Sequence, residues 1–300
     1  MLTGLHVLLT YKCTFECDHC FVYSSPAAEG TFTLEKVCRS LDQAVSLGTI
    51  EEIYFEGGEP FMYYPLLIEG AREARKRGFK VGVVTNAYFA TSQADAELWL
   101  RPLVALGIFD LGISQDSFHS DDERDNPAKR TLAAALRLGL PASTICIERP
   151  AVESSSSREQ TRGSPVTGGQ VKFRGRAVQK LSAGLPLRPW DELTECPYED
   201  LASPERVHID AYGNVHLCQG LLMGNMWESP LSALVDSYEP SSHPLCGPLL
   251  RGGPAELARA CGTAHEDGYI DACHLCYQMR VALIDRYPRC LGPRQVYGLE

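Results

Sequence analysis

The chain has 300 residues, which is long enough to bury a sizeable core as one large domain or as one domain with a small appendage. Its formal net charge of −10 argues against a nucleic-acid-binding surface. No run of about 18 apolar residues occurs, which argues against a transmembrane helix. The first residues form neither a basic region nor a cleavage site, so we expect a cytoplasmic protein that does not bind membranes.

The sequence contains twelve cysteines, several of them clustered. In a small secreted domain this number would suggest disulfides. In a chain of this length without an export signal, clustered cysteines indicate metal binding.

Strand and helix patterns alternate along the first half of the chain. This alternation is typical of repeated βα units around a parallel sheet, which closes into a barrel or forms a doubly wound sheet. Polar and glycine residues follow the predicted strands at the end where barrel active sites are built. The strands are expected at 5–11, 52–56, 80–85, 109–114, 142–147 and 170–173, and the helices at 34–47, 65–77, 92–106 and 121–138.

The pattern changes in two places. Residues 153–169 are rich in serine and charge, and we expect either a mobile loop at the barrel mouth or a plain connector. From about Asp191 the alternation stops, and a β-hairpin is expected around Ala211-Tyr212-Gly213, followed by helices near 230–238, 254–261 and 271–287. We therefore predict two domains, 1–188 and 189–300.

A cysteine loop follows the first predicted strand and contains Cys13, Cys17 and Cys20. Thiolates are the usual protein ligands of iron–sulfur clusters, and three cysteines leave the fourth iron of a cubane cluster open. Two alternatives remain from the loop alone. Zinc also takes Cys and His ligands, so His19 would complete a Cys3His set, and a disulfide is the other.

The Cys-x3-Cys-x2-Cys spacing of this loop resembles the radical S-adenosylmethionine (SAM) superfamily, and so does Gly57-Gly58-Glu59-Pro60 at the end of the second predicted strand. The resemblance implies a partial (β/α)6 TIM-like barrel. It also implies a [4Fe–4S] cluster on the three cysteines, with SAM on the open iron and its methionine amino group held by the glycine turn. An external electron donor of the flavodoxin or ferredoxin type reduces the cluster, and SAM is cleaved to a 5′-deoxyadenosyl radical that abstracts hydrogen.

The resemblance suggests further SAM contacts. Ser114 and Asp116, after the fourth predicted strand, are candidates for the ribose, although they are also suited to cap the next helix. Arg149 is a candidate for the SAM carboxylate or else a surface charge. His19 is placed beside the cluster and the SAM adenine. Thr85-Asn86 is a weaker candidate for the pocket wall, and His119 is expected to be a structural histidine.

The C-terminal cysteines resemble the twitch, or truncated SPASM, domain of radical SAM dehydrogenases and peptide-modifying enzymes. This resemblance implies a second, auxiliary [4Fe–4S] cluster. A structural zinc site is the alternative, and Cys261 or Cys290 is able to replace one ligand. The expected ligands are Cys196, Cys218, Cys273 and Cys276.

One further thiol is a candidate for catalysis. Cys246 lies in a proline-flanked stretch, predicted to be a loop near the barrel mouth, where a thiol would donate a hydrogen atom to a substrate radical.

Three functions follow from these features. The first is modification of a ribosomally made peptide, because residues 173–177 and the auxiliary domain resemble peptide-modifying members, although no separate leader-peptide-binding domain is expected before the barrel. The second is a small-molecule oxidoreductase, dehydrogenase or isomerase. The third is a non-enzymatic iron–sulfur or zinc protein, in which the glycine turn would have no function.

Overall fold

The computed structural model describes residues 1–120, 124–150 and 171–299. Its main feature is an eight-stranded sheet in the order β5-β4-β3-β2-β1-β7-β8-β9. The five N-terminal strands pair in parallel, and β7 adds to the free edge of β1, also in parallel. These strands are β1 (Gly4–Thr10), β2 (Glu52–Gly57), β3 (Lys80–Thr85), β4 (Asp110–Ser114), β5 (Ala142–Ile145) and β7 (Arg206–Ile209).

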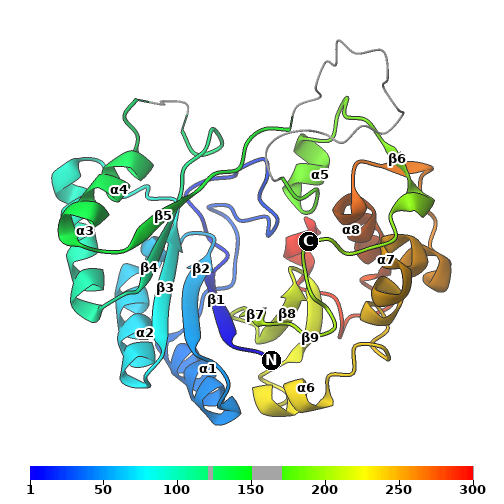
Figure 1. Cartoon of the computed structure of the whole chain (residues 1–300), viewed down its shortest axis with the longest axis horizontal. Coiled ribbons are helices and arrows are strands. Elements are labelled where there is room, and N and C mark those ends of the chain that lie inside the picture. The colour runs from blue at the N-terminus through cyan, green and yellow to red at the C-terminus, as the bar shows by residue number, and fades with distance from the viewer. Residues whose placement is uncertain (121–123, 151–170, 300) are drawn as a thin grey trace.

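Four helices cover the outer face of β1 to β5 (Figure 1). Three of them begin at a side-chain N-cap and end at a left-handed glycine, the arrangement that satisfies the free backbone groups at helix ends. The helices are α1 (Leu34–Leu47), α2 (Tyr64–Lys76), α3 (Gln93–Leu106) and α4 (Pro127–Leu138). The α/β class and the partial barrel are as expected, but α4 begins six residues later than predicted.

The side chains of β1 alternate between the two faces of the sheet. Leu5 and Val7 are fully buried, and Val7 lies in register with Phe55, which packs against α2. His6 lies between them and points to the opposite, concave face, because successive side chains of a strand alternate. The chemistry-bearing side chains described below lie on this concave face or at the carboxyl ends of the strands.

The sixth strand predicted at 170–173 is wrong for the residues that the structure describes. Residues 171–175 form no strand, and the short helix α5 (Arg176–Lys180) follows. At Gly175 the φ angle is 63°, and a Cβ atom would lie 2.5 Å from the Cα atom of Phe21. The backbone N–H of Arg176 donates to the carbonyl of Cys20. This segment is therefore held against the cysteine loop rather than at the edge of the sheet.

The C-terminal part continues the same sheet. β8 (Asn214–Cys218) and β9 (Leu221–Asn225) add antiparallel strands, and the predicted hairpin forms, with Gly213 at a φ of 89°. Because β7 pairs with β1, the sheet runs across the predicted boundary at residue 188, and the division into two domains stays a prediction. The other elements are β6 (Arg188–Pro189), α6 (Leu231–Ser237), α7 (Cys246–Cys261), β10 (Gly268–Tyr269) and α8 (Ala272–Leu283), with the 3-10 helices η1 (Pro60–Tyr63), η2 (Trp190–Glu192) and η3 (Arg294–Tyr297).

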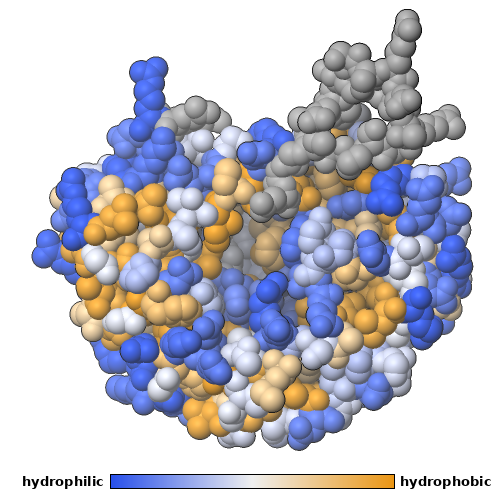
Figure 2. Space-filling view, in the orientation of Figure 1, coloured by the Kyte–Doolittle hydropathy of each residue, from blue (hydrophilic) through white to orange (hydrophobic). Residues whose placement is uncertain are grey.

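Figure 2 shows the surface on one side of the molecule. The face is hollowed near its middle, between the half built on β1 to β5 and the C-terminal half, and polar residues gather around the hollow. No helix within 1–120, 124–150 and 171–299 is long and apolar enough to cross a membrane. The loop expected at 153–169 lies outside the described residues.

Candidate functional site

The cysteine loop begins directly after β1, and all three thiols are free. The Sγ atom of Cys13 accepts hydrogen bonds from the backbone N–H of Phe15 and the side-chain amide of Asn86, both over 3.4 Å. The Sγ atom of Cys20 accepts from the backbone N–H of Ser24 over 3.3 Å. Donors aimed at sulfur atoms are a usual feature of iron–sulfur sites, where they help to set the reduction potential.

Burial makes the thiols of Cys13 and Cys17 poor acids in the absence of a cation. It raises the pKa of Cys13 to about 11 and that of Cys17 to about 12, because a thiolate loses its solvation there. A metal ion would supply the missing positive charge and deprotonate both groups. The loop is therefore suited to a metal centre rather than to a free reactive thiolate.

A histidine and an aspartate hold the second thiol of the loop. The Nε2 atom of His119 lies 3.5 Å from the Sγ atom of Cys17, and its Nδ1 atom lies 2.7 Å from Oδ1 of Asp116. Asp116 also accepts from the backbone N–H groups of Phe118 and Ile147. His119 is hydrogen-bonded, as expected of a structural histidine, but it also touches the cysteine loop, which the sequence did not predict.

The two glycines of the turn after β2 are needed for close contact with the chain before the cysteine loop. A Cβ atom at Gly57, where φ is 136°, would lie 2.4 Å from the carbonyl oxygen of Thr10. One at Gly58 would lie 2.0 Å from the carbonyl oxygen of Lys12. The N–H groups of Gly58 and Glu59 donate to the same two carbonyls, over 2.7 and 2.8 Å. The turn is thereby fixed beside the cysteine loop.

Glu59 links the ends of β2 and β3. Its fully buried carboxylate accepts from the backbone N–H groups of Phe61 and Asn86 and from the hydroxyl of Thr85, over 2.7 to 3.0 Å. Burial raises the pKa of Glu59 to about 7 although these donors oppose the shift. Pro60 follows as the first residue of η1. The side chain of Glu59 therefore positions Asn86, which in turn contacts Cys13.

A pocket of about 260 Å³ lies at the carboxyl ends of β3 and β4. It is lined by Ser114 and Asp116, which were predicted to contact SAM, and by Asn86 and His119, which touch the cysteine loop. The pairing of β3 with β4 places these residues next to one another. Its wall includes Phe15, Asn86, Ser114, Gln115, Asp116 and His119.

Arg149 and His19 lie beside this pocket rather than in its wall. The guanidinium of Arg149 is 3.5 Å from Asp18 and lies over the ring of Phe118, and its side chain is 54% exposed. The ring of His19 packs against that of Phe118 at 4.4 Å and lies near His119. Burial lowers the pKa of His19 to about 4, so its ring is neutral. Contacts of either residue with SAM stay predictions.

A second pocket, of about 350 Å³, brings together the four C-terminal cysteines predicted as ligands. They come from the loop after η2, the end of β8 and the first two turns of α8. Cys261 and Cys290 are not among the residues that line this pocket. The four are Cys196, Cys218, Cys273 and Cys276.

Two buried arginines share this pocket, and the sequence did not single them out. Arg174 lies 2.7 Å from the Sγ atom of Cys218 and 3.7 Å from Glu199. Arg280, which is 1% exposed, lies 3.9 Å from the same sulfur and donates to the carbonyl of Gln219. Buried charges need opposite charges nearby. The two buried guanidinium groups that line the pocket therefore favour an anionic group in it.

Cys246 does not lie in a loop, so that expectation is wrong. It is the first residue of α7, is fully buried, and hydrogen-bonds with Tyr238. It lines neither pocket. Its role as a hydrogen-atom donor stays a prediction, and this burial does not favour it.

The comparison with known families follows this geometry. Residues 7–147 match the radical SAM superfamily. That stretch contains the cysteine loop, the glycine turn and the Asp116–His119 pair. The chain therefore contains a radical SAM domain, and the similarity of this domain to enzymes of the superfamily supports an enzyme.

Individual relatives match between about a third and two fifths of this chain. The tungsten-containing aldehyde ferredoxin oxidoreductase cofactor-modifying protein of Pyrococcus furiosus is 31% identical over 105 residues, 35% of this chain and 28% of that protein. The putative peptide biosynthesis protein YydG of Bacillus subtilis is 25% identical over 124 residues, 41% and 39% of the two chains. The antilisterial bacteriocin subtilosin biosynthesis protein AlbA, also of Bacillus subtilis, is 33% identical over 113 residues, which are 38% of this chain and 24% of that protein. The matches thus span well under half the length of these relatives.

Among solved structures, BtrN in complex with AdoMet and 2-DOIA aligns with a TM-score of 0.49 and 17% identity, over 78% of this chain and 82% of that one. Native anSMEcpe with bound AdoMet aligns with a TM-score of 0.47 and 12% identity, over 99% of this chain and 98% of that one.

Proposed function

We propose that this enzyme modifies a ribosomally made peptide, using a [4Fe–4S] cluster held by Cys13, Cys17 and Cys20 together with SAM. The observation that carries the proposal is the fixed contact between the glycine turn and the cysteine loop. Gly58 and Glu59 bond to the backbone directly before the loop, and Asn86 connects Glu59 to Cys13. The motif expected to hold SAM and the loop expected to hold iron thus form one unit.

The chain's own side chains have distinct tasks in this site. The amide of Asn86 stabilises negative charge on the Cys13 sulfur, and Asp116 orients His119 toward Cys17. The wall with Ser114 and Asp116 offers polar groups to the rest of SAM. When bound, the cluster and SAM supply a 5′-deoxyadenosyl radical that abstracts hydrogen from the substrate.

We propose a second, auxiliary cluster in the pocket with the four C-terminal cysteines. The buried guanidinium groups of Arg174 and Arg280 support it, because a cubane cluster with four thiolate ligands is an anion. The buried Nε atom of Arg174 has no hydrogen-bond partner within the described part of the chain, which leaves a donor for such a group. Two clusters need about eight irons per chain.

The peptide substrate is proposed from the relatives' names. YydG and AlbA are named as peptide and bacteriocin biosynthesis proteins. A small-molecule substrate is the second candidate, favoured by the similarity to the GTP 3′,8-cyclase of Rhodococcus opacus, 32% identical over 118 residues, 38% of this chain and 32% of that enzyme.

The experiment uses a short peptide encoded beside the gene of this enzyme. The protein is reconstituted anaerobically with iron and sulfide and incubated with SAM, dithionite and that peptide. We expect a change in the mass of the peptide that depends on SAM. If no neighbouring peptide changes mass while 5′-deoxyadenosine is formed, the peptide substrate is wrong and the radical chemistry stands.

A further inference from the structure

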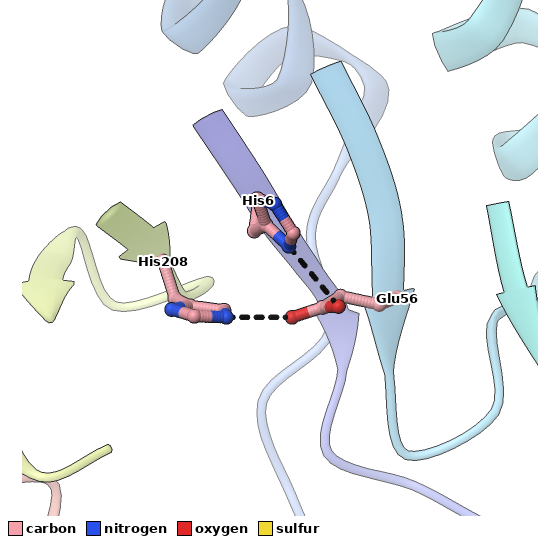
Figure 3. A group of neighbouring side chains, drawn as sticks. All are labelled: His6, Glu56 and His208. Atoms are coloured by element: carbon pink, nitrogen blue, oxygen red, sulfur yellow. Dashed lines mark hydrogen bonds and ion pairs between the residues drawn. The ribbon is translucent and has the colours of Figure 1, made fainter. Parts of the chain in front are cut away.

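Three polar side chains meet on the concave face of the sheet (Figure 3). They are His6 from β1, Glu56 from β2 and His208 from β7, and Figure 3 shows both imidazole rings directed at the carboxylate. Oε2 of Glu56 lies 3.2 Å from Nδ1 of His6, and Oε1 lies 3.1 Å from Nε2 of His208. One ligand atom from each residue lies within 4.8 Å of the other two.

The strand pairing explains why they meet. His6 lies in register with His208 on one side and with Tyr54 on the other, so all three project from the same face. Glu56 follows Tyr54 by two residues and therefore points to that face as well. The ring of Tyr54 stacks on His6 at 4.8 Å and holds its orientation. The backbone frame of three paired strands makes this a rigid site.

We propose that His6, Glu56 and His208 bind one divalent transition-metal ion, of which zinc is the best match. Two imidazole nitrogens and a carboxylate oxygen are a ligand set that zinc uses where it keeps an open coordination position. With metal–ligand bonds of about 2.0–2.1 Å, tetrahedral donors lie about 3.3 Å apart. The two carboxylate oxygens of Glu56 lie 3.2 and 3.1 Å from the two imidazole nitrogens, and one donor atom from each residue lies within 4.8 Å of the other two.

The surroundings leave the site open to an ion. The three side chains are 16 to 18% exposed, so the concave face gives access to them. The buried Nδ1 atom of His208 has no hydrogen-bond partner among the described residues. In the metal-free state Nε2 of His208 donates its proton to Glu56, and a bound metal would displace that proton, which Nδ1 is free to carry. A bound ion would keep a position open toward the concave face.

The test adds zinc to the cluster-loaded protein, so that iron occupies the cysteine sites. After gel filtration, we expect about one zinc per chain, and X-ray absorption at the zinc edge shows nitrogen and oxygen ligands without sulfur. Glu56→Gln and His208→Gln lower the zinc affinity at least tenfold. His265→Gln, at an exposed histidine stacked on Trp190, is the matched control and keeps the zinc.

The iron content and the melting temperature without zinc report whether each variant folds. Should Glu56→Gln fail to fold, the same measurement on His6→Gln replaces it. Zinc that remains in the variants as in the wild type, sulfur ligands at the zinc edge of the wild type, or a wild type that retains no zinc would each overturn the proposal.

Discussion

The side-chain amide of Asn86 donates a hydrogen bond to the Sγ atom of Cys13 over 3.4 Å. The backbone N–H of Asn86 donates a second hydrogen bond, to the carboxylate of Glu59, over 2.7 Å. A residue after β3 thus connects the glycine turn after β2 to the cysteine loop after β1.

Replacing Asn86 with leucine removes the donor to Cys13 while keeping the size of the side chain. Fewer hydrogen bonds to cluster sulfur atoms lower the reduction potential of an iron–sulfur cluster. We expect a more negative midpoint potential for the N-terminal cluster, measured by a redox titration followed by electron paramagnetic resonance. An unchanged potential in a protein with full iron content would show that this bond does not act on the cluster.

Gly58 makes the closest approach of the turn to the cysteine loop. Gly58→Ala places a Cβ atom 2.0 Å from the carbonyl oxygen of Lys12, and we expect a loss of about 3 kcal/mol or more in the free energy of unfolding. Gly139→Ala is the control, since its φ is also positive but no atom lies within 4 Å, and it costs about 1 kcal/mol. Denaturant unfolding measures both, and equal losses would contradict the proposed contact.

The raised pKa of Glu59 predicts that the stability of the metal-free protein depends on pH. Its pKa is raised to about 7 in the folded state, above an unfolded value of about 4.3. A raised carboxyl pKa means that the folded state binds the proton more tightly, so this stabilisation is present below pH 4.3 and is lost as the pH rises to about 7.

Unfolding in denaturant at pH 5 and pH 8 tests this sign. The wild type is expected to lose more stability between the two pH values than Glu59→Gln, which cannot titrate. The Gln variant is less stable at both values, because it cannot accept all three hydrogen bonds of the carboxylate. A pH difference of the same size in both proteins would show that Glu59 does not titrate in this range.

Arg280 is expected to matter for the auxiliary cluster alone. Arg280→Met removes a buried cation beside Cys218, so we expect the iron content to fall from about eight to about four per chain while SAM cleavage persists. Arg259→Met, at a half-exposed arginine over Trp190, is the matched control and keeps all the iron. An unchanged iron content in Arg280→Met would remove the charge argument for this cluster.

The sequence was informative where the chemistry is local. The spacing of Cys13, Cys17 and Cys20, and the glycine turn at a strand end, are short patterns, and the structure brings them together as expected. The contacts made by distant residues were not predictable in this way. Arg280 is a charged residue in a helix, which usually faces solvent, and only the fold shows that it is buried beside thiols.

Long-range strand pairing was the main gap. The sequence predicted a sixth strand at 170–173, which residues 171–173 do not form, and it did not predict that β7 pairs with the free edge of β1. Nothing local to His208 predicts that it lies beside His6, because the pairing joins opposite ends of the chain. For this reason the site formed by His6, Glu56 and His208 was invisible in the sequence.

The most direct measurement is the formation of 5′-deoxyadenosine by the reconstituted enzyme with SAM and dithionite under anaerobic conditions. The wild type is expected to form it, and so is Cys38→Ala, whose thiol lies on α1 outside both pockets. Cys17→Ala is expected to form none. Formation by Cys17→Ala at the rate of the wild type, or no formation by the wild type with its full iron content, would contradict the cluster site at Cys13, Cys17 and Cys20.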